Sequence, residues 1–107
     1  MLFADKIRNL REERQMPQRQ LAAALEIDTP MYSRIERGER RAKREQIQVI
    51  ANTLQTDSEE LLSLWLADQV NAIILTEKQV AKRVLELADK SIHNDIEIQN
   101  YAKRKAI

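Results

Sequence analysis

Apolar residues recur at helical spacing along most of the chain, beginning at its N-terminus. Phe3, Ile7 and Leu10 follow one another every three or four residues, which predicts a helix over residues 2–14. Pro17 interrupts this pattern and is well placed to open a second, short helix over residues 18–25.

A third apolar stripe predicts a helix over residues 29–37. Asp28 is a good N-cap for it, and Pro30 falls in the first turn, where its missing N–H is harmless. Gly38, the only glycine of the chain, follows as the expected left-handed terminator. Tyr32 and Ile35 then point inward, whereas the opposite face carries small polar residues and one long cation, namely Thr29, Pro30, Ser33 and Arg34.

The pattern continues with three further segments. Residues 44–54 form a fourth helix, a fifth begins after the cap-like pair Asp57 and Glu60, and a sixth follows Thr76. The tail from residue 94 to 107 is expected to form a short helix or to fray. The chain is therefore predicted to be all-α.

Composition supports this fold class and excludes several functions. Among 107 residues there are only 1 Gly and 2 Pro, which is too few turn residues for a sandwich or a barrel. With 0 Cys and 1 His, thiolate or histidine metal sites, disulfides and the usual catalytic triads are not expected, so we predict no cofactor, no metal and no enzymatic activity. Apolar runs are too short for a membrane span and no signal peptide is evident, so the expected location is the cytoplasm.

Charge is distributed unevenly although the net charge is only +1. Residues 34–44 hold 6 basic and 2 acidic residues, a local excess that can mark a surface facing nucleic acid. The alternative is a solvated charged loop.

Two short helices joined by a tight turn suggest a helix-turn-helix, whose second helix enters the DNA major groove. The segments IRNLREER, QLAAALEI and YSRIERGER stand in an order and spacing that resemble the phage-repressor (Xre/Cro) helix-turn-helix family over residues 5–62. The resemblance implies a five-helix repressor-like domain over residues 1–62 and an additional helical extension over residues 63–107.

The resemblance also implies roles for individual residues. The base-reading face would comprise Thr29, Pro30, Ser33 and Arg34, and the phosphate contacts would come from Gln18, Arg37, Arg41, Lys43 and Arg44. Arg41 or Arg44 is alternatively expected in a narrow minor groove. Arg11 and Glu36 match a structural ion pair of the family, the alternative being two independent surface charges.

Two residues depart from the family pattern. Glu26 stands where a turn glycine is usual, and it would cost about 1 kcal/mol if left-handed. Pro17 replaces the usual Ser or Thr cap of the second helix, which leaves an N–H without its cap.

The extension is expected to join two copies of the chain, because one recognition helix reads only a few base pairs. The candidate dimerisation residues are Leu62, Trp65, Leu66, Val70 and Ile73, unless the last helix folds back over them. The expected function is a sequence-specific transcription regulator, a repressor, that binds double-stranded DNA as a homodimer. An antitoxin or a restriction–modification controller with the same domain and a partner-binding extension is the alternative, and the sequence does not identify a small-molecule effector.

Overall fold

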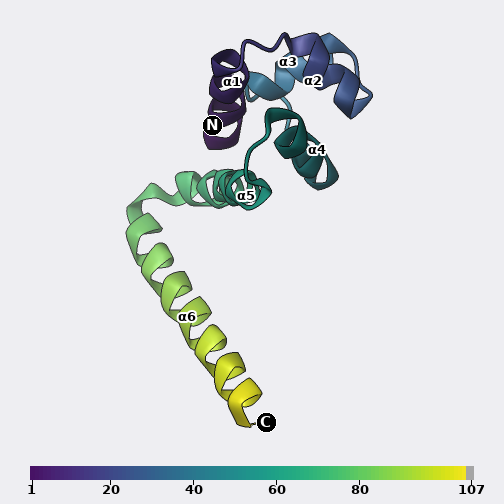
Figure 1. Ribbon diagram of the computed structural model, residues 1–107. Coiled ribbons are helices and arrows are strands. Elements are labelled where there is room, and N and C mark those ends of the chain that lie inside the picture. The colour runs from purple at the N-terminus through teal and green to yellow at the C-terminus, as the bar shows by residue number, and fades with distance from the viewer. Residues whose placement is uncertain (106–107) are drawn as a thin grey trace. The chain divides into compact units, whose positions relative to one another are not determined.

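The computed structural model describes residues 1–105, and over that range it contains helices and no strand (Figure 1). The elements in chain order are α1 (Leu2–Glu13), α2 (Gln18–Leu25), α3 (Thr29–Glu36), α4 (Arg44–Leu54), α5 (Ser58–Ile74), the short 3-10 helix η1 (Leu75–Val80) and α6 (Ala81–Lys105). The predicted all-α class is confirmed, with five helices and a C-terminal helical extension. No helix in residues 1–105 is long and apolar enough to cross a membrane.

Contacts divide the chain into two units, of which the first is Met1–Val70 and the second begins at Asn71. In the first unit, α2 packs against α3 and α4, and α1 packs against the same two helices. The side chains that are almost fully enclosed between them are Ile7, Leu21, Tyr32, Ile50, Leu54 and Leu61. Ala22 is also buried, and its small side chain lets α2 approach its neighbours closely.

The first four helices all end in the same way. A residue one or two positions past each helix end has a positive φ, at Gln15, Glu26 and Gln55 (54–57°) and at Gly38 (73°). In each case the next N–H donates to the carbonyl five residues earlier, as in the bond of 3.1 Å from Ile27 to Ala22. Glu26 is therefore left-handed, and the turn between α2 and α3 keeps its shape without a glycine.

Gly38 also lies close to the first residue of the chain. A Cβ at this position would lie 2.9 Å from the Sδ atom of Met1, so the exposed, flexible Met1 side chain would have to shift. The positive φ of Gly38 is therefore the stronger reason for glycine here.

Asp68 and Trp65 of α5 make long-range hydrogen bonds to earlier parts of the first unit. The carboxylate of Asp68 accepts from the backbone N–H groups of Leu2 (2.8 Å) and Phe3 (3.0 Å), so it caps the N-terminus of α1. A carboxylate here also interacts favourably with the positive end of the helix dipole. Because the contact reaches Asp68, the compact unit extends beyond the boundary expected at residue 62.

Trp65 is part of this same attachment and does not lie on a free surface. It is only 9 % exposed, its indole N–H donates to the Ala42 carbonyl at 2.8 Å, and the Arg41 guanidinium lies 3.9 Å from the ring centroid. This placement corrects its assignment to the dimerisation surface, since the core of one chain already uses the ring.

The C-terminal segment also departs from expectation. The Thr76 hydroxyl donates back to the Ile73 carbonyl at 2.7 Å, and the helical path breaks at Glu77 (φ −133°, ψ 56°). A single helix, α6, then runs on through residue 94 to Lys105, where a short or frayed segment was expected. The last two residues of that tail, 106 and 107, lie outside the described residues.

Replacing Glu26 by Gly should stabilise the protein. Glycine adopts the left-handed conformation without strain, so we expect Glu26→Gly to raise the free energy of unfolding by about 0.5–1 kcal/mol. Urea denaturation followed by circular dichroism measures the change. Ala24→Gly, two residues earlier on the exposed face of α2, should lower it by about 1 kcal/mol. If Glu26→Gly lowers the free energy of unfolding as much as Ala24→Gly does, the backbone of Glu26 is not strained.

Candidate nucleic-acid interface

The outer face of α3 is short, polar and open. Thr29, Pro30 and Arg34 are exposed and Ser33 is half-buried, whereas Tyr32 and Ile35 point into the core. The Asp28 carboxylate accepts from the Met31 N–H at 2.7 Å, so the first turn of α3 is capped as the sequence predicts. The four residues expected to read bases therefore share one accessible side of a well-formed helix.

The cations along this face are not equivalent. Within residues 1–105, the Arg34 guanidinium makes no hydrogen bond or ion pair, so its five donors are available. Arg37 is engaged on both sides: it donates to the Ser33 hydroxyl at 2.9 Å and forms two bonds to the Glu39 carboxylate, at 3.2 and 3.0 Å. Arg37, and more weakly Arg34, hold the pKa of Glu39 below its ordinary value.

A buried ion pair positions α3 from behind. The Arg11 guanidinium of α1 binds the Glu36 carboxylate at the end of α3. The bonds are 2.6 Å from Nε to Oε2 and 3.0 Å from Nη2 to Oε1, and Glu36 is only 2 % exposed. These are the two residues that the family resemblance pairs, and the contact raises the pKa of Arg11.

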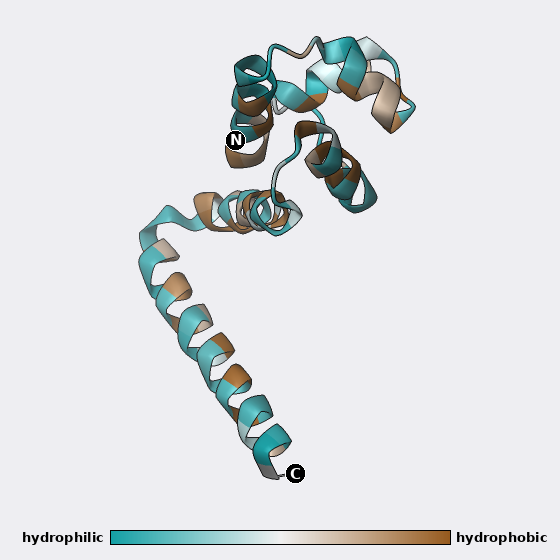
Figure 2. Cartoon of the chain, viewed as in Figure 1, coloured by the Kyte–Doolittle hydropathy of each residue, from teal (hydrophilic) through white to brown (hydrophobic). Residues whose placement is uncertain are grey.

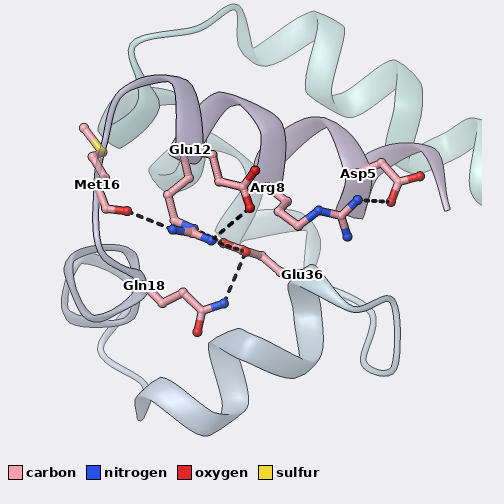
Figure 3. Close-up of polar contacts among 7 residues, drawn as sticks. Asp5, Arg8, Glu12, Met16, Gln18 and Glu36 are labelled. Atoms are coloured by element: carbon pink, nitrogen blue, oxygen red, sulfur yellow. Dashed lines mark hydrogen bonds and ion pairs between the residues drawn. The ribbon is translucent and has the colours of Figure 1, made fainter.

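The same ion pair reaches two further segments. Arg11 donates through Nη1 to the Met16 carbonyl at 2.9 Å, which fixes the connection between α1 and α2. The Gln18 amide donates to Glu36 Oε1 at 3.2 Å, so the first residue of α2 is held by the last residue of α3. Figure 3 shows Gln18 directed at the same Glu36 carboxylate. An amide N–H₂ has two hydrogens, so Gln18 keeps one for an acceptor outside the protein.

Tyr32 lies beside this charged group in the core. Burial raises its pKa well above the ordinary value, and the neighbouring Glu36 carboxylate adds to the effect. The phenol is therefore neutral at any pH at which the protein would bind DNA.

The basic residues after α3 differ in what they contact. Lys43 and Arg44 are exposed at the start of α4, where the Lys43 backbone N–H donates to the Gln46 side chain at 2.8 Å. Arg41, in contrast, stacks on Trp65 and donates to the Trp65 carbonyl at 3.1 Å. The structure gives Arg41 a role in holding α5, so we leave it out of the phosphate contacts proposed below.

Three exposed charged residues in this region had no role in the sequence prediction. Arg19 in the first turn of α2 and Arg40 after α3 are exposed cations, and Glu39 is the carboxylate that binds Arg37. Arg40 could have been found from the basic run that contains it. Glu39 could not, because its effect depends on the turn at Gly38 that brings it back toward Arg37.

Residues 1–105 contain no cluster of side chains suited to a metal ion. The candidate dimerisation residues of α5 are placed differently from one another: Leu62 is half-buried, and Leu66, Val70 and Ile73 are exposed.

Two short packed helices, the second held by its buried end and open on its outer face, define a helix-turn-helix DNA-binding domain. The chain belongs to the helix-turn-helix domain family, whose profile matches residues 2–65. This family binds DNA and is typically not enzymatic. No curated protein and no solved structure matches the chain.

Breaking the buried ion pair should destabilise the domain strongly. Arg11→Met leaves the enclosed Glu36 carboxylate without its cation, so we expect the free energy of unfolding to fall by about 3–5 kcal/mol. The double variant Arg11→Met with Glu36→Leu removes both charges and should regain most of this loss. Urea denaturation of the two variants beside the wild type decides the matter, and a double variant no more stable than Arg11→Met would contradict the pair.

Removing the Glu39 carboxylate should strengthen DNA binding. Glu39 occupies the donors of Arg37 that a phosphate would otherwise accept from, so we expect Glu39→Gln to raise affinity for random-sequence DNA about two- to tenfold at low salt. Fluorescence anisotropy with labelled duplex measures the gain, which should shrink as salt screens the charges.

The matched control for this prediction is Glu86→Gln. Glu86 also pairs with an arginine, Arg83, at 3.8 Å, but it belongs to α6 in the second unit. A similar gain for both variants would show that net charge alone is responsible, and no gain for Glu39→Gln would show that its carboxylate does not compete with phosphate.

Proposed function

We propose that the protein is a sequence-specific transcription regulator of the Xre/Cro type that represses by occupying its DNA site. The observation that carries the proposal is the combination of an ion-paired, buried Glu36 with an unpaired, exposed Arg34 on the same eight-residue helix. Such a helix is rigid at its attachment and free where it would meet base edges. The major groove is about 12 Å wide and admits one helix in this orientation.

Within this proposal, Arg34 is the main base-reading residue. A guanidinium forms two parallel bonds to the O6 and N7 atoms of guanine, which discriminates against other bases by about 1–3 kcal/mol. Thr29 and Ser33 have hydroxyls for bases or phosphate, and Pro30 offers an apolar contact that suits a thymine methyl group. The Ser33 hydroxyl accepts from Arg37 in the free protein, so it retains its own hydrogen for the DNA.

The proposed phosphate contacts surround this helix. Gln18 lies at the start of α2, whose N-cap Pro17 provides no side-chain cap, so both its amide and the first N–H groups of the helix suit an anion. Lys43 and Arg44 flank the other side at the start of α4, and Arg37 joins them once it exchanges Glu39 for a phosphate.

Repression is the mode of regulation that the proposal assigns. A protein that binds a promoter tightly blocks other proteins from that DNA without any further activity. A single recognition helix reads only a few base pairs, so two copies on neighbouring half-sites about 34 Å apart are expected. Binding should weaken steeply with salt, because phosphate contacts release counterions.

Two substitutions separate base reading from phosphate binding. Arg34→Ala should weaken binding to the preferred site by about 1–3 kcal/mol with little effect on random DNA. Lys43→Ala should weaken binding to the preferred site and to random DNA by similar factors. It should also reduce the slope of log affinity against log salt concentration by about 1. The preferred site is obtained first by selecting bound duplexes from a random pool, and affinities are then measured by anisotropy over a range of salt.

The contrast between the two variants is the test. If Arg34→Ala weakens preferred and random DNA equally, Arg34 binds phosphate and the proposed reading face is not used. If the selection returns no preferred sequence at all, the protein binds DNA without the specificity that a regulator of this kind requires.

A further inference from the structure

α6 carries a broad apolar face that nothing in residues 1–105 buries. Every side chain described from residue 82 to 104 is exposed. Figure 2 shows apolar positions recurring along α6 up to its last turns, which are hydrophilic. The large apolar residues of this helix and of the residue before it are between 42 and 67 % exposed, and they are Val80, Val84, Leu85, Leu87, Ile92, Ile96, Ile98 and Tyr101.

Five of these side chains, Val80, Val84, Leu87, Ile98 and Tyr101, share one side of the helix, and each is about half exposed. They form an apolar strip that a second helix can cover. A helix of 25 residues is also ~37 Å long, which allows continuous contact with another helix of equal length. An exposed apolar surface of this extent marks an interaction site.

The order of residues along α6 fits a second copy of the same helix. Positions 80, 84, 87, 91, 94, 98 and 101 alternate in steps of four and three, the spacing of a coiled-coil seam. Five of them are Val, Leu, Ile or Tyr, and the two polar ones, Ser91 and Asn94, are neighbours in the middle. Ser91 and Asn94 favour the register in which each meets the same residue of the other helix. In any other register these polar side chains would lie against apolar ones.

Charges beside the seam select the parallel orientation. In a parallel pair, Lys90 of one helix lies beside Asp95 of the other, which is attractive. The other two flanking pairs place Arg83 beside Ala88 and Glu97 beside Ala102, so they add no repulsion. An antiparallel pair centred on the same polar residues would bring Arg83 of one helix to Arg104 of the other, and this repulsion offsets the attraction between Lys90 and Glu97 that the same alignment creates. Leu85, Ile92 and Ile96 lie away from the seam, and Ile96 shares the outer position of Lys82 and Asp89, so these three side chains do not contribute to the proposed pairing.

We propose that α6 pairs in parallel with α6 of a second copy of this chain, and that this pairing forms the dimer. The inference rests on the proposed function in one respect: a parallel pair tethers both DNA-binding units at the same end, as two neighbouring half-sites require. It assigns dimerisation mainly to α6, within the extension that the sequence predicts to dimerise, whereas the candidate residues chosen from the sequence lie on α5.

A single cysteine tests the orientation, because the natural chain has none. In a parallel pair each seam residue meets its own copy, so full-length Val84→Cys should form a covalent dimer under mild oxidation. In an antiparallel pair the two substituted positions would lie about 25 Å apart along the axis, and no bond would form. Asp89→Cys, on the outer side of the helix, is the matched control and should stay largely monomeric on a non-reducing gel.

A charge exchange tests the register without disturbing the apolar face. Lys90→Asp should weaken dimerisation about tenfold in sedimentation experiments, and adding Asp95→Lys should restore it, because the attraction is rebuilt with reversed signs. Lys82→Asp, on the outer face, should leave the dimer unchanged. A double variant that remains as weak as Lys90→Asp would overturn the parallel register.

The outcomes separate this inference from the proposed function. A wild-type chain that stays monomeric at all concentrations overturns the pairing of α6, even if it binds a preferred DNA sequence through Arg34. A dimer that cross-links through Val84→Cys yet selects no DNA sequence supports the pairing and refutes the proposed regulator. A mass of four chains, or dimerisation only with a different protein, likewise overturns the two-helix pairing.

Discussion

The position of α3 depends on how the buried charge of Glu36 is balanced. Glu36 is the last residue of α3, where the negative end of the helix dipole makes a carboxylate unfavourable. Enclosure from water adds to that cost, and the two short bonds from Arg11 offset both. Since the same pair of residues also binds Met16 and Gln18, a single ionic contact fixes α1, the following loop, α2 and α3 relative to one another.

Two of the basic residues near α3 are already bound within the protein. The run from residue 34 to 44 contains six basic residues, and counted in sequence they suggest one large positive surface. In the structure, Arg37 binds Ser33 and Glu39, and Arg41 covers Trp65. Arg34 is left as the unpaired cation on the outer face of α3. The side chains of Arg40, Lys43 and Arg44 are also exposed without a hydrogen bond or ion pair in residues 1–105, so the free positive charge is lower than the composition indicates and extends from α3 into the loop that follows it.

The sequence predicts most of what depends on local interactions. The first four helices begin where expected and end within about a residue of it, because caps and terminators such as Asp28 and Gly38 act over only a few residues. The Asp68 cap on α1 joins residues 66 positions apart, and no local pattern signals it. The extent of α6 was also missed, since its last part has few apolar residues and is supported by pairs such as His93 with Glu97, 3.0 Å apart.

α5 shows why apolar residues in a sequence cannot all be assigned to one surface. Trp65 and Leu66 are adjacent, so they point about 100° apart, and the structure buries one and exposes the other. The side with Leu61, Trp65 and Asp68 completes the first unit, and this side must be buried for Asp68 to cap α1. Only Leu66, Val70 and Ile73 remain on the opposite side, a narrow stripe. A stripe of this width can add to an interface, and the other large exposed apolar residues of the extension lie mainly on α6.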